Sequence, residues 1–105
     1  MSECLFCKIN TKSIPAKVIY DDDDMLAFYD ITPKAQVHFL LIPKEHINSM
    51  LELTAEHQLL MGKMLVKANQ LAQSLGLEGY KVQINTGAKG GQEVFHLHMH
   101  ILGNK

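Results

Sequence analysis

The sequence lacks the features that several classes of protein require. It has no tryptophan, three prolines and two cysteines among 105 residues, so neither a disulfide scaffold nor a proline-rich linker is expected. No apolar run approaches the roughly 20 residues of a membrane span, and no secretory signal is visible. The net charge of −1 argues against nucleic-acid binding, which needs a basic surface. We expect one cytoplasmic domain over residues 1–105, with no nucleic-acid or membrane partner.

The patterning of apolar and turn residues predicts several short strands and one long helix. Strands are expected at residues 17–20, 25–30, 37–42, 80–85 and 95–102, and helices at residues 4–10 and 55–75. Thr54 is a suitable N-cap for the long helix, and Gly76 is a natural residue to follow its end. Strands in a row, then a helix, then more strands predict an antiparallel α+β domain. The four consecutive aspartates at 21–24 are interpreted as a hairpin turn rather than a metal site, because calcium loops interleave acids with glycine.

The long helix has two apolar surfaces of different size. Its broad apolar arc should cover the sheet and consists of Leu60, Met61, Met64, Leu65, Ala68, Leu71, Ala72 and Leu75. Leu59, Gly62 and Val66 interrupt the opposite, polar face, and a glycine inside a helix costs about 1 kcal/mol relative to alanine. Close approach of a second helix explains this glycine, which predicts a homodimer. Scattered surface apolar residues are the alternative.

Six histidines are many for a chain of this length, and three of them alternate near its end. In a strand, His96, His98 and His100 share one face, while residues 97, 99 and 101 face the core. Such a row is suited to a catalytic zinc site, or to a nucleophilic imidazole whose neighbours bind a phosphoryl group. The preceding loop, residues 85–92, is rich in glycine and contains Lys89, which favours phosphate.

The segment His-Leu-His-Met-His-Ile-Leu at 96–102 resembles the signature of the histidine triad (HIT) family. Further similar segments lie at residues 5–9, 27–33, 38–44 and 90–96, and together they most resemble the bacterial type of the Hint branch, the purine nucleoside phosphoramidases. The resemblance implies a HIT-like α+β fold, a five-stranded antiparallel sheet with one long helix and a short N-terminal helix, paired into a dimer.

The resemblance also implies a function and a set of site residues. The protein would be a hydrolase of purine nucleotide derivatives (of AMP or GMP), such as AMP-lysine phosphoramidates, with no organic cofactor. His98 would be the nucleophile that forms a nucleotidyl-histidine, His96 would orient it, and His100 and His38 would bind phosphate oxygens. The nucleotide-binding residues would be Asp30 for the ribose, Phe6, Ile9, Ile14, Phe28, Ile31 and Leu40 for the purine, and Asn85, Gly91, Gln92, Glu93 and Val94 for the phosphate and leaving group.

Several alternatives remain at this point. Each aliphatic wall residue could equally be plain core, and Glu93 stands where family members often have serine. Dinucleoside polyphosphates are a second substrate class for the same chemistry. A nucleotide-binding interaction module with vestigial catalysis is a different class of function, as is a hydrolytic zinc enzyme that uses all three triad histidines as ligands.

Cys4 and Cys7 form a C-x₂-C pair. This spacing suits two zinc ligands, and the alternative is two free thiols in a reducing compartment. The resemblance implies the former, because related proteins combine such a pair with two histidines in a structural zinc site. The matching positions here are His46 and His96. His57, near the start of the long helix, is interpreted as a surface residue.

Overall fold

The computed structural model describes residues 4–105. In chain order its helices and strands are α1 (Leu5–Asn10), β1 (Val18–Asp21), β2 (Met25–Tyr29), β3 (Val37–Pro43), α2 (Gln58–Ser74), β4 (Lys81–Gln83) and β5 (Met99–Gly103). Short 3₁₀ turns lie at Met50–Glu52, Ala55–His57 and Ala88–Gly90. No helix among the described residues is long and apolar enough to cross a membrane.

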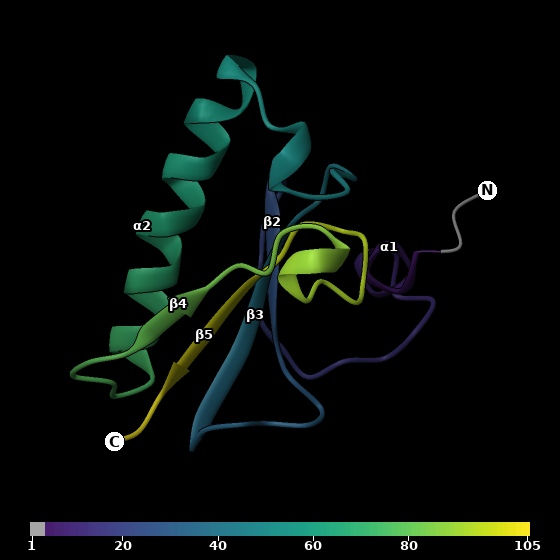
Figure 1. Ribbon diagram of the computed structural model, residues 1–105. Helices are drawn as coiled ribbons and strands as arrows, with labels where there is room; N and C mark the ends of the chain where they lie inside the picture. The colour runs from purple at the N-terminus through teal and green to yellow at the C-terminus, as the bar shows by residue number, and fades with distance from the viewer. Residues whose placement is uncertain (1–3) are drawn as a thin grey trace.

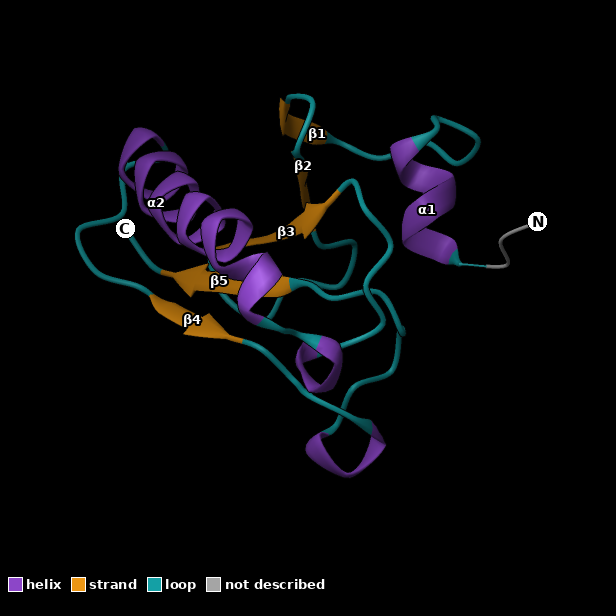
Figure 2. Ribbon diagram, turned by 90° about the horizontal axis from the view of Figure 1, so that it is seen from above, coloured by secondary structure: helices purple, strands orange, loops and turns teal. Residues whose placement is uncertain are grey.

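The strands form one antiparallel sheet in the order β1-β2-β3-β5-β4. The fold predicted by the resemblance is confirmed: five antiparallel strands, one long helix and a short N-terminal helix. Helix α2 lies along one side of the sheet and α1 on the other (Figure 1), and the view from above shows α2 beside β3, β5 and β4 (Figure 2). β4 is therefore an edge strand, and its other edge is open in this chain.

Each face of the sheet has its own apolar layer. On the α2 face, side chains of β2, β3 and β5 such as Phe39 and Ile101 pack with Met64 and Ala68 of α2. The opposite face packs against α1 and is smaller; its members are Phe6, Ile9, Leu26, Phe28, Leu40 and Ile42. β3 is buried along its whole length because both of its faces are covered.

Helix α2 follows the sequence prediction, with a tighter first turn. Thr54 caps residues 55–57, which are a 3₁₀ turn, through a capping box in which the His57 ring accepts the Thr54 N–H. Gly76, at φ 86°, follows the C-terminus in the left-handed conformation that glycine tolerates. The predicted apolar arc is wrong at Leu65, which is 51% exposed, because the covered stripe on the helix is narrower than the sequence indicates.

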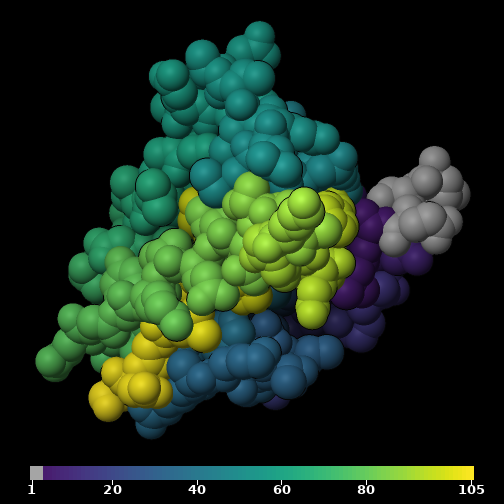
Figure 3. All heavy atoms as spheres, in the orientation of Figure 1, coloured from purple at the N-terminus to yellow at the C-terminus, as the bar shows by residue number. Residues whose placement is uncertain are grey.

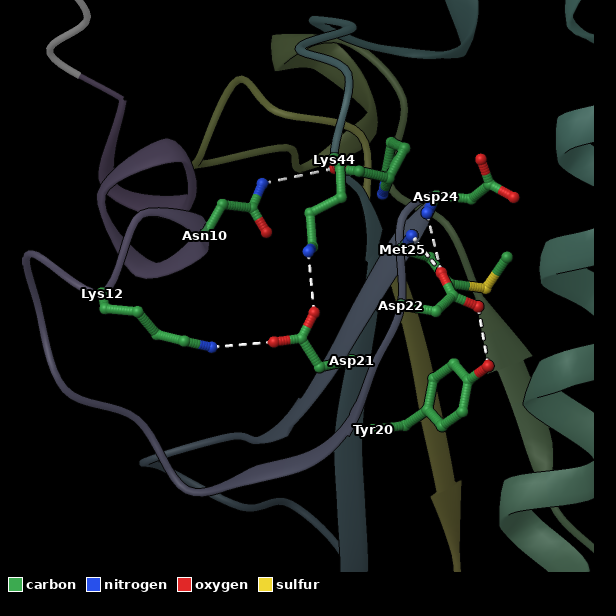
Figure 4. A network of polar contacts seen from close by, with 9 residues as sticks. Asn10, Lys12, Tyr20, Asp21, Asp22, Asp24, Met25 and Lys44 are labelled. Carbon is green, nitrogen blue, oxygen red and sulfur yellow. Dashed lines mark hydrogen bonds and ion pairs between the residues drawn. The ribbon is translucent and has the colours of Figure 1, made fainter.

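The turn predicted at residues 21–24 begins one residue later, because Asp21 is the last residue of β1; Asp21 and Asp22 both have cationic or donor partners (Figure 4). The Asp21 carboxylate pairs with the Lys12 ammonium at 2.8 Å and the Lys44 ammonium at 2.7 Å, and hydrogen bonds from these two lysines lower its pKa to about 2. Asp22 accepts the N–H groups of residues 24 and 25 and the Tyr20 hydroxyl. The turn is therefore held by these contacts rather than simply solvated.

The two C-terminal strands are shorter than the sequence predicts. β4 spans Lys81–Gln83 rather than residues 80–85, and β5 begins at Met99 rather than at residue 95. His96 and His98 precede β5 outside the ladder, and the backbone N–H of Leu97 between them donates to the Ile47 carbonyl instead of to a neighbouring strand. Buried and half-buried residues alternate within β5, whereas residues 96–98 are all buried.

Candidate active site

The strand register assembles a row of functional groups on the α1 face of the sheet. Phe28 of β2 pairs with Leu40 of β3, Leu40 pairs with His100 of β5, and His100 pairs with Gln83 of β4. Paired residues point to the same face of a sheet. The row therefore runs from apolar side chains on β2, through an imidazole, to polar side chains at the open edge.

The His98 ring is oriented by the backbone of residue 96. Its Nδ1 lies 2.7 Å from the carbonyl oxygen of His96, and because a carbonyl can only accept, Nδ1 carries the proton. In the neutral ring the unprotonated nitrogen is then Nε2. The Phe6 ring packs edge-on against the His98 ring with centroids 5.0 Å apart. Hydrogen bond and ring contact together fix one tautomer and one orientation.

His38 and His100 form a pair in which the direction of donation is also defined. The Lys34 backbone N–H donates to His38 Nδ1 at 3.1 Å, so the proton of the neutral His38 ring is on Nε2. That nitrogen lies 3.0 Å from His100 Nδ1 and 3.4 Å from an Asp30 carboxylate oxygen. His100 accepts at Nδ1 and therefore carries its own proton on Nε2.

Burial keeps these imidazoles neutral. Desolvation lowers the pKa of His98, His38 and His100, because a buried site disfavours the charged ring. The pKa of His100 falls to about 4, where positive charge on His98 and His38 adds to the effect of burial. The Asp30 carboxylate opposes the shift in all three rings.

A cavity of about 410 Å³ opens beside the imidazoles. Ten of the residues expected at the site line it: Phe6, Asp30, His38, Leu40, Asn85, Gly91, Glu93, Val94, His98 and His100. Its volume lies in the range of small-molecule sites. In the space-filling view, the yellow-green segment that contains the glycine-rich loop lies beside the purple N-terminal helix (Figure 3).

The other expected residues lie outside this lining. Ile9 and Phe28 are buried in the apolar layer under α1, and Ile14 packs against that layer, so plain core packing describes their present contacts. Ile31 is 96% exposed and borders a neighbouring groove that shares Asp30 and His38 with the cavity. Contact of these side chains with a purine remains a prediction.

Gln92 is also outside the lining, for a different reason. Its side chain is buried and its amide is saturated by backbone groups: it accepts the Gly87 N–H and donates to the carbonyls of Asn48 and Val94. Direct contact with a substrate, as the resemblance implies, would require these bonds to break. The observed role is to hold the loop.

Four cavity residues were not predicted as site residues: Lys34, Lys81, Gln83 and Leu102. The alternation of residues 80–85 assigns Lys81 and Gln83 to a polar face, but only the pairing of β4 with β5 shows that this face continues the histidine row. The position of Lys81, on the alternating polar face of a strand that leads into the glycine-rich loop, is the feature of the sequence that could have indicated a site residue. The sequence around Lys34 offers no such indication, because Lys34 lies in a turn.

A second cluster contains two sulfur and two imidazole ligand atoms that lie within 4.8 Å of one another. Its members are Cys4, Cys7, His46 and His96. The Cys4 and Cys7 sulfurs lie 3.4 and 3.5 Å from His96 Nδ1, and the Cys7 sulfur lies 3.1 Å from His46 Nδ1. Each ring donates its other N–H: His96 to the Pro43 carbonyl at 2.9 Å and His46 to the Asn48 side-chain oxygen at 2.7 Å. Two imidazole lone pairs thus face two sulfurs, and the cluster could hold a metal ion.

The group Asp30, His38 and His100 is also compact enough to surround an ion. However, the Lys34 N–H occupies the His38 Nδ1 lone pair, so Nε2 is a donor and not a ligand. In this tautomer His38 cannot bind a cation, which disfavours a metal ion at this group. Within residues 4–105 no ligand cluster combines His96, His98 and His100, which disfavours a zinc enzyme with a triad of histidine ligands.

Comparison with known proteins identifies the class that this fold and site define. The family model described as "Scavenger mRNA decapping enzyme C-term binding" matches residues 3–105. The chain is 53% identical to protein HitA of Neisseria gonorrhoeae over 98% of its length and 97% of that protein's. It is 41% identical to the purine nucleoside phosphoramidase of Escherichia coli K12, over 98% of this chain and 88% of that one.

Solved structures agree with this assignment. A HIT family hydrolase from Legionella pneumophila superposes with a TM-score of 0.94 at 45% identity, covering 96% of this chain and 92% of that one. A histidine triad protein from Clostridium difficile gives a TM-score of 0.95 at 39% identity, covering 100% and 93%. The site and fold are those of a nucleotide hydrolase or transferase. The chain belongs to the histidine triad family, whose members bind purine nucleotides.

We expect His100 to stay neutral down to about pH 5, because its pKa is about 4 whereas an unfolded histidine titrates near 6.5. Between these two values the unfolded chain binds more protons, so the free energy of unfolding should fall as the pH is lowered through this interval. Nitrogen-15 NMR of the imidazole rings gives the midpoint and the tautomer directly. A His100 midpoint near 6.5, or a proton on its Nδ1, would contradict the hydrogen-bond assignment.

Proposed function

We propose that the protein hydrolyses purine nucleoside phosphoramidates, of the AMP-lysine type, by attack of His98 on the α-phosphorus. The observation that carries this proposal is the tautomer of His98: its Nδ1 proton is committed to the His96 carbonyl, which leaves Nε2 with the lone pair. His38 directs its Nε2–H to His100 Nδ1, which leaves the Nε2–H of His100 as a donor. Among the three imidazoles that line the cavity, His98 is therefore suited to attack and His100 to donate to the phosphoryl group.

The reaction has two displacements. His98 Nε2 forms a bond to the α-phosphorus while the phosphorus–nitrogen bond to the amine breaks, and the departing amine takes one proton from solvent. A water molecule then attacks the same phosphorus and returns one proton to solvent, the bond to His98 Nε2 breaks, and a nucleoside monophosphate is released. The His100 Nε2–H group is placed to stabilise charge on the phosphoryl oxygens in both steps.

The lining supports a purine nucleoside as the retained part of the substrate. Phe6 and Leu40 offer an apolar wall, and Asp30 offers a carboxylate that accepts ribose hydroxyl groups. A relative with this activity in its name is 41% identical over nearly the full length of both chains. Dinucleoside polyphosphates are a second substrate class, favoured by Lys34 and Lys81, whose ammonium groups suit an anionic leaving group.

We expect His98→Ala to lower kcat/KM for an adenosine phosphoramidate by roughly three orders of magnitude or more, because the nucleophile is removed. Rapid quench and mass spectrometry should detect a nucleotidyl-protein in the wild type and none in the variant. His57→Ala is the matched control: this ring belongs to the cap of α2 and should leave turnover intact.

Unchanged turnover in His98→Ala would remove the assignment of the nucleophile. A wild type that binds AMP in calorimetry but turns over no faster than His98→Ala would instead indicate a nucleotide-binding interaction module. Recovery of activity in His98→Gly on addition of imidazole would support the nucleophile independently.

We further propose that Cys4, Cys7, His46 and His96 hold a structural zinc ion. Sulfur and nitrogen ligands of one tetrahedral zinc, at about 2.3 and 2.0–2.1 Å from the metal, lie about 3.5 Å apart. The sulfur–nitrogen separations of 3.1 to 3.5 Å support this geometry. A closed site of four protein ligands supplies no reaction chemistry and would only position the segment before β5. Two thiolate ligands require a reducing compartment, which supports a cytoplasmic location.

Purified protein is expected to contain about one zinc ion per chain, with two sulfur and two nitrogen ligands in X-ray absorption. Cys4→Ser should lose the metal and lower the melting temperature, whereas Ser13→Ala, at an exposed position outside the ligand set, should change neither. Retention of a full equivalent of zinc by Cys4→Ser would contradict the assigned ligand set.

We also propose that two chains form a symmetric homodimer through α2 and the open edge of β4. Leu59 and Val66 are 72% and 59% exposed on α2, and a Cβ added at Gly62 between them would have no atom within 4 Å. In a two-fold interface a patch meets its own copy, so a glycine there permits close approach of two helices. An open strand edge is itself a surface that invites pairing.

Gly62→Glu should convert this dimer to a monomer, because it places two like charges at the helix crossing. Sedimentation at micromolar concentration measures the change, and Ser13→Glu, at an exposed position after α1 and away from both α2 and β4, is the control. A monomeric wild type, or a Gly62→Glu variant that remains a dimer, would contradict the proposed interface.

A further inference from the structure

The glycine-rich loop beside the cavity is closed by hydrogen bonds to the Gly87 carbonyl from the N–H groups of Gly90 and Gln92, and by one buried side chain. Residues 88–91 are exposed, and Gly87 and Gly91 have φ values of 74° and 88°, which suit glycine. Gln92, at 5% exposure, accepts the Gly87 N–H at 2.9 Å and so closes the loop onto its own base. The amide NH₂ of Gln92 points the other way and donates to the Asn48 carbonyl at 2.7 Å.

Asn48 is in turn bound to the metal-binding cluster. Its side-chain oxygen accepts the His46 Nε2–H at 2.7 Å, and His46 presents Nδ1 to the Cys7 sulfur. The Glu52 carboxylate also holds Asn48. It accepts hydrogen bonds from the Asn48 backbone N–H (N···O 3.2 Å) and from the Asn48 side-chain NH₂ (N···O 3.0 Å). The NH₂ bond assigns the amide orientation, so the oxygen faces His46.

We propose that Asn48 and Gln92 are positioning residues that connect the metal-binding cluster to the glycine-rich loop, so that metal bound at His46 orders the loop beside the cavity. The proposal rests on the metal site proposed above. It adds that the bound metal affects the order of the loop on the phosphate side of the cavity, as well as the position of the segment before β5. Neither residue lines the cavity, so both act through their hydrogen bonds.

The physical basis is the fixed polarity of each link. A ligating imidazole with a partner on its other nitrogen keeps one orientation and binds the metal more strongly. When His46 is held by a metal at Nδ1, its Nε2–H fixes the Asn48 oxygen, and the Asn48 carbonyl remains available to Gln92. Because coupling between two equilibria is reciprocal, a loop that is ordered by metal must also, when it is ordered, favour metal binding.

The central measurement is amide hydrogen exchange at Gly87, Gly90 and Gly91 in zinc-loaded protein and in protein treated with a chelator, without any nucleotide. In the wild type we expect chelation to speed exchange at these amides by roughly fivefold or more, the effect of losing one net hydrogen bond. In Gln92→Met, which keeps the side-chain volume but has no amide, exchange should be fast in both states. Gln73→Met, on the exposed end of α2, is the matched control and should behave as the wild type.

Two further variants separate the halves of the connection. Gln92→Glu can still accept the Gly87 N–H but, when ionised, cannot donate to the Asn48 carbonyl, so its loop should be protected less and no longer respond to zinc. Asn48→Ala should lower zinc affinity about 10- to 100-fold, the usual cost of losing the partner of a metal ligand. Competition with a chromophoric chelator measures that affinity.

Loop exchange that is identical in zinc-loaded and chelated wild type would overturn the proposal, as would zinc-dependent protection that survives in Gln92→Met. These readouts involve no substrate, so they are independent of the assignment of His98. Kinetics provide a further test. Gln92→Met should lower kcat/KM for the phosphoramidate but still form the nucleotidyl-protein, whereas His98→Ala should not form it.

Discussion

The buried imidazole of His96 is the contact on which the site depends. Its Nε2–H donates to the Pro43 carbonyl at the end of β3, its Nδ1 faces the Cys4 and Cys7 sulfurs, and its own carbonyl accepts the Nδ1–H of His98. One residue thus joins the sheet, the N-terminal helix and the proposed nucleophile. Its ring is 0% exposed, and burial lowers its pKa, so the neutral form that the contact of Nδ1 with the sulfurs needs is the stable one.

This arrangement explains why Phe6, near the start of the described chain, lines the cavity. Phe6 lies between the two cysteines on α1, and its ring packs on His98 at 5.0 Å and on Phe28 at 5.6 Å. A six-residue helix is too short to be stable on its own. The contacts of its cysteines with His96 and His46 therefore hold Phe6 in place, and with it one wall of the cavity. Desolvation of the imidazoles depends on that wall.

The sequence predicted the parts of the molecule that follow from local pattern. Alternation predicted the pattern of β5, and the Thr54 and Gly76 signals located the ends of the long helix. The features that the sequence failed to predict depend on contacts with residues distant in the chain. The ladder begins only at Met99, since the Leu97 N–H is bound to the Ile47 carbonyl, and no local pattern encodes that. The role of Gln92 likewise depends on Asn48, which is 44 residues away in the chain.

The register across the sheet gives the site a direction that the histidine motif alone does not have. From β2 to β4 the face passes from the apolar Phe28 and Leu40, through His100, to Gln83 and Lys81 at the open edge. In the proposed reaction a purine would lie on the apolar side, with the α-phosphate at the imidazoles and the leaving group toward the cationic edge. Because β4 is also the edge proposed to meet a second chain, Lys81 and Gln83 would lie beside both the leaving group and the proposed interface.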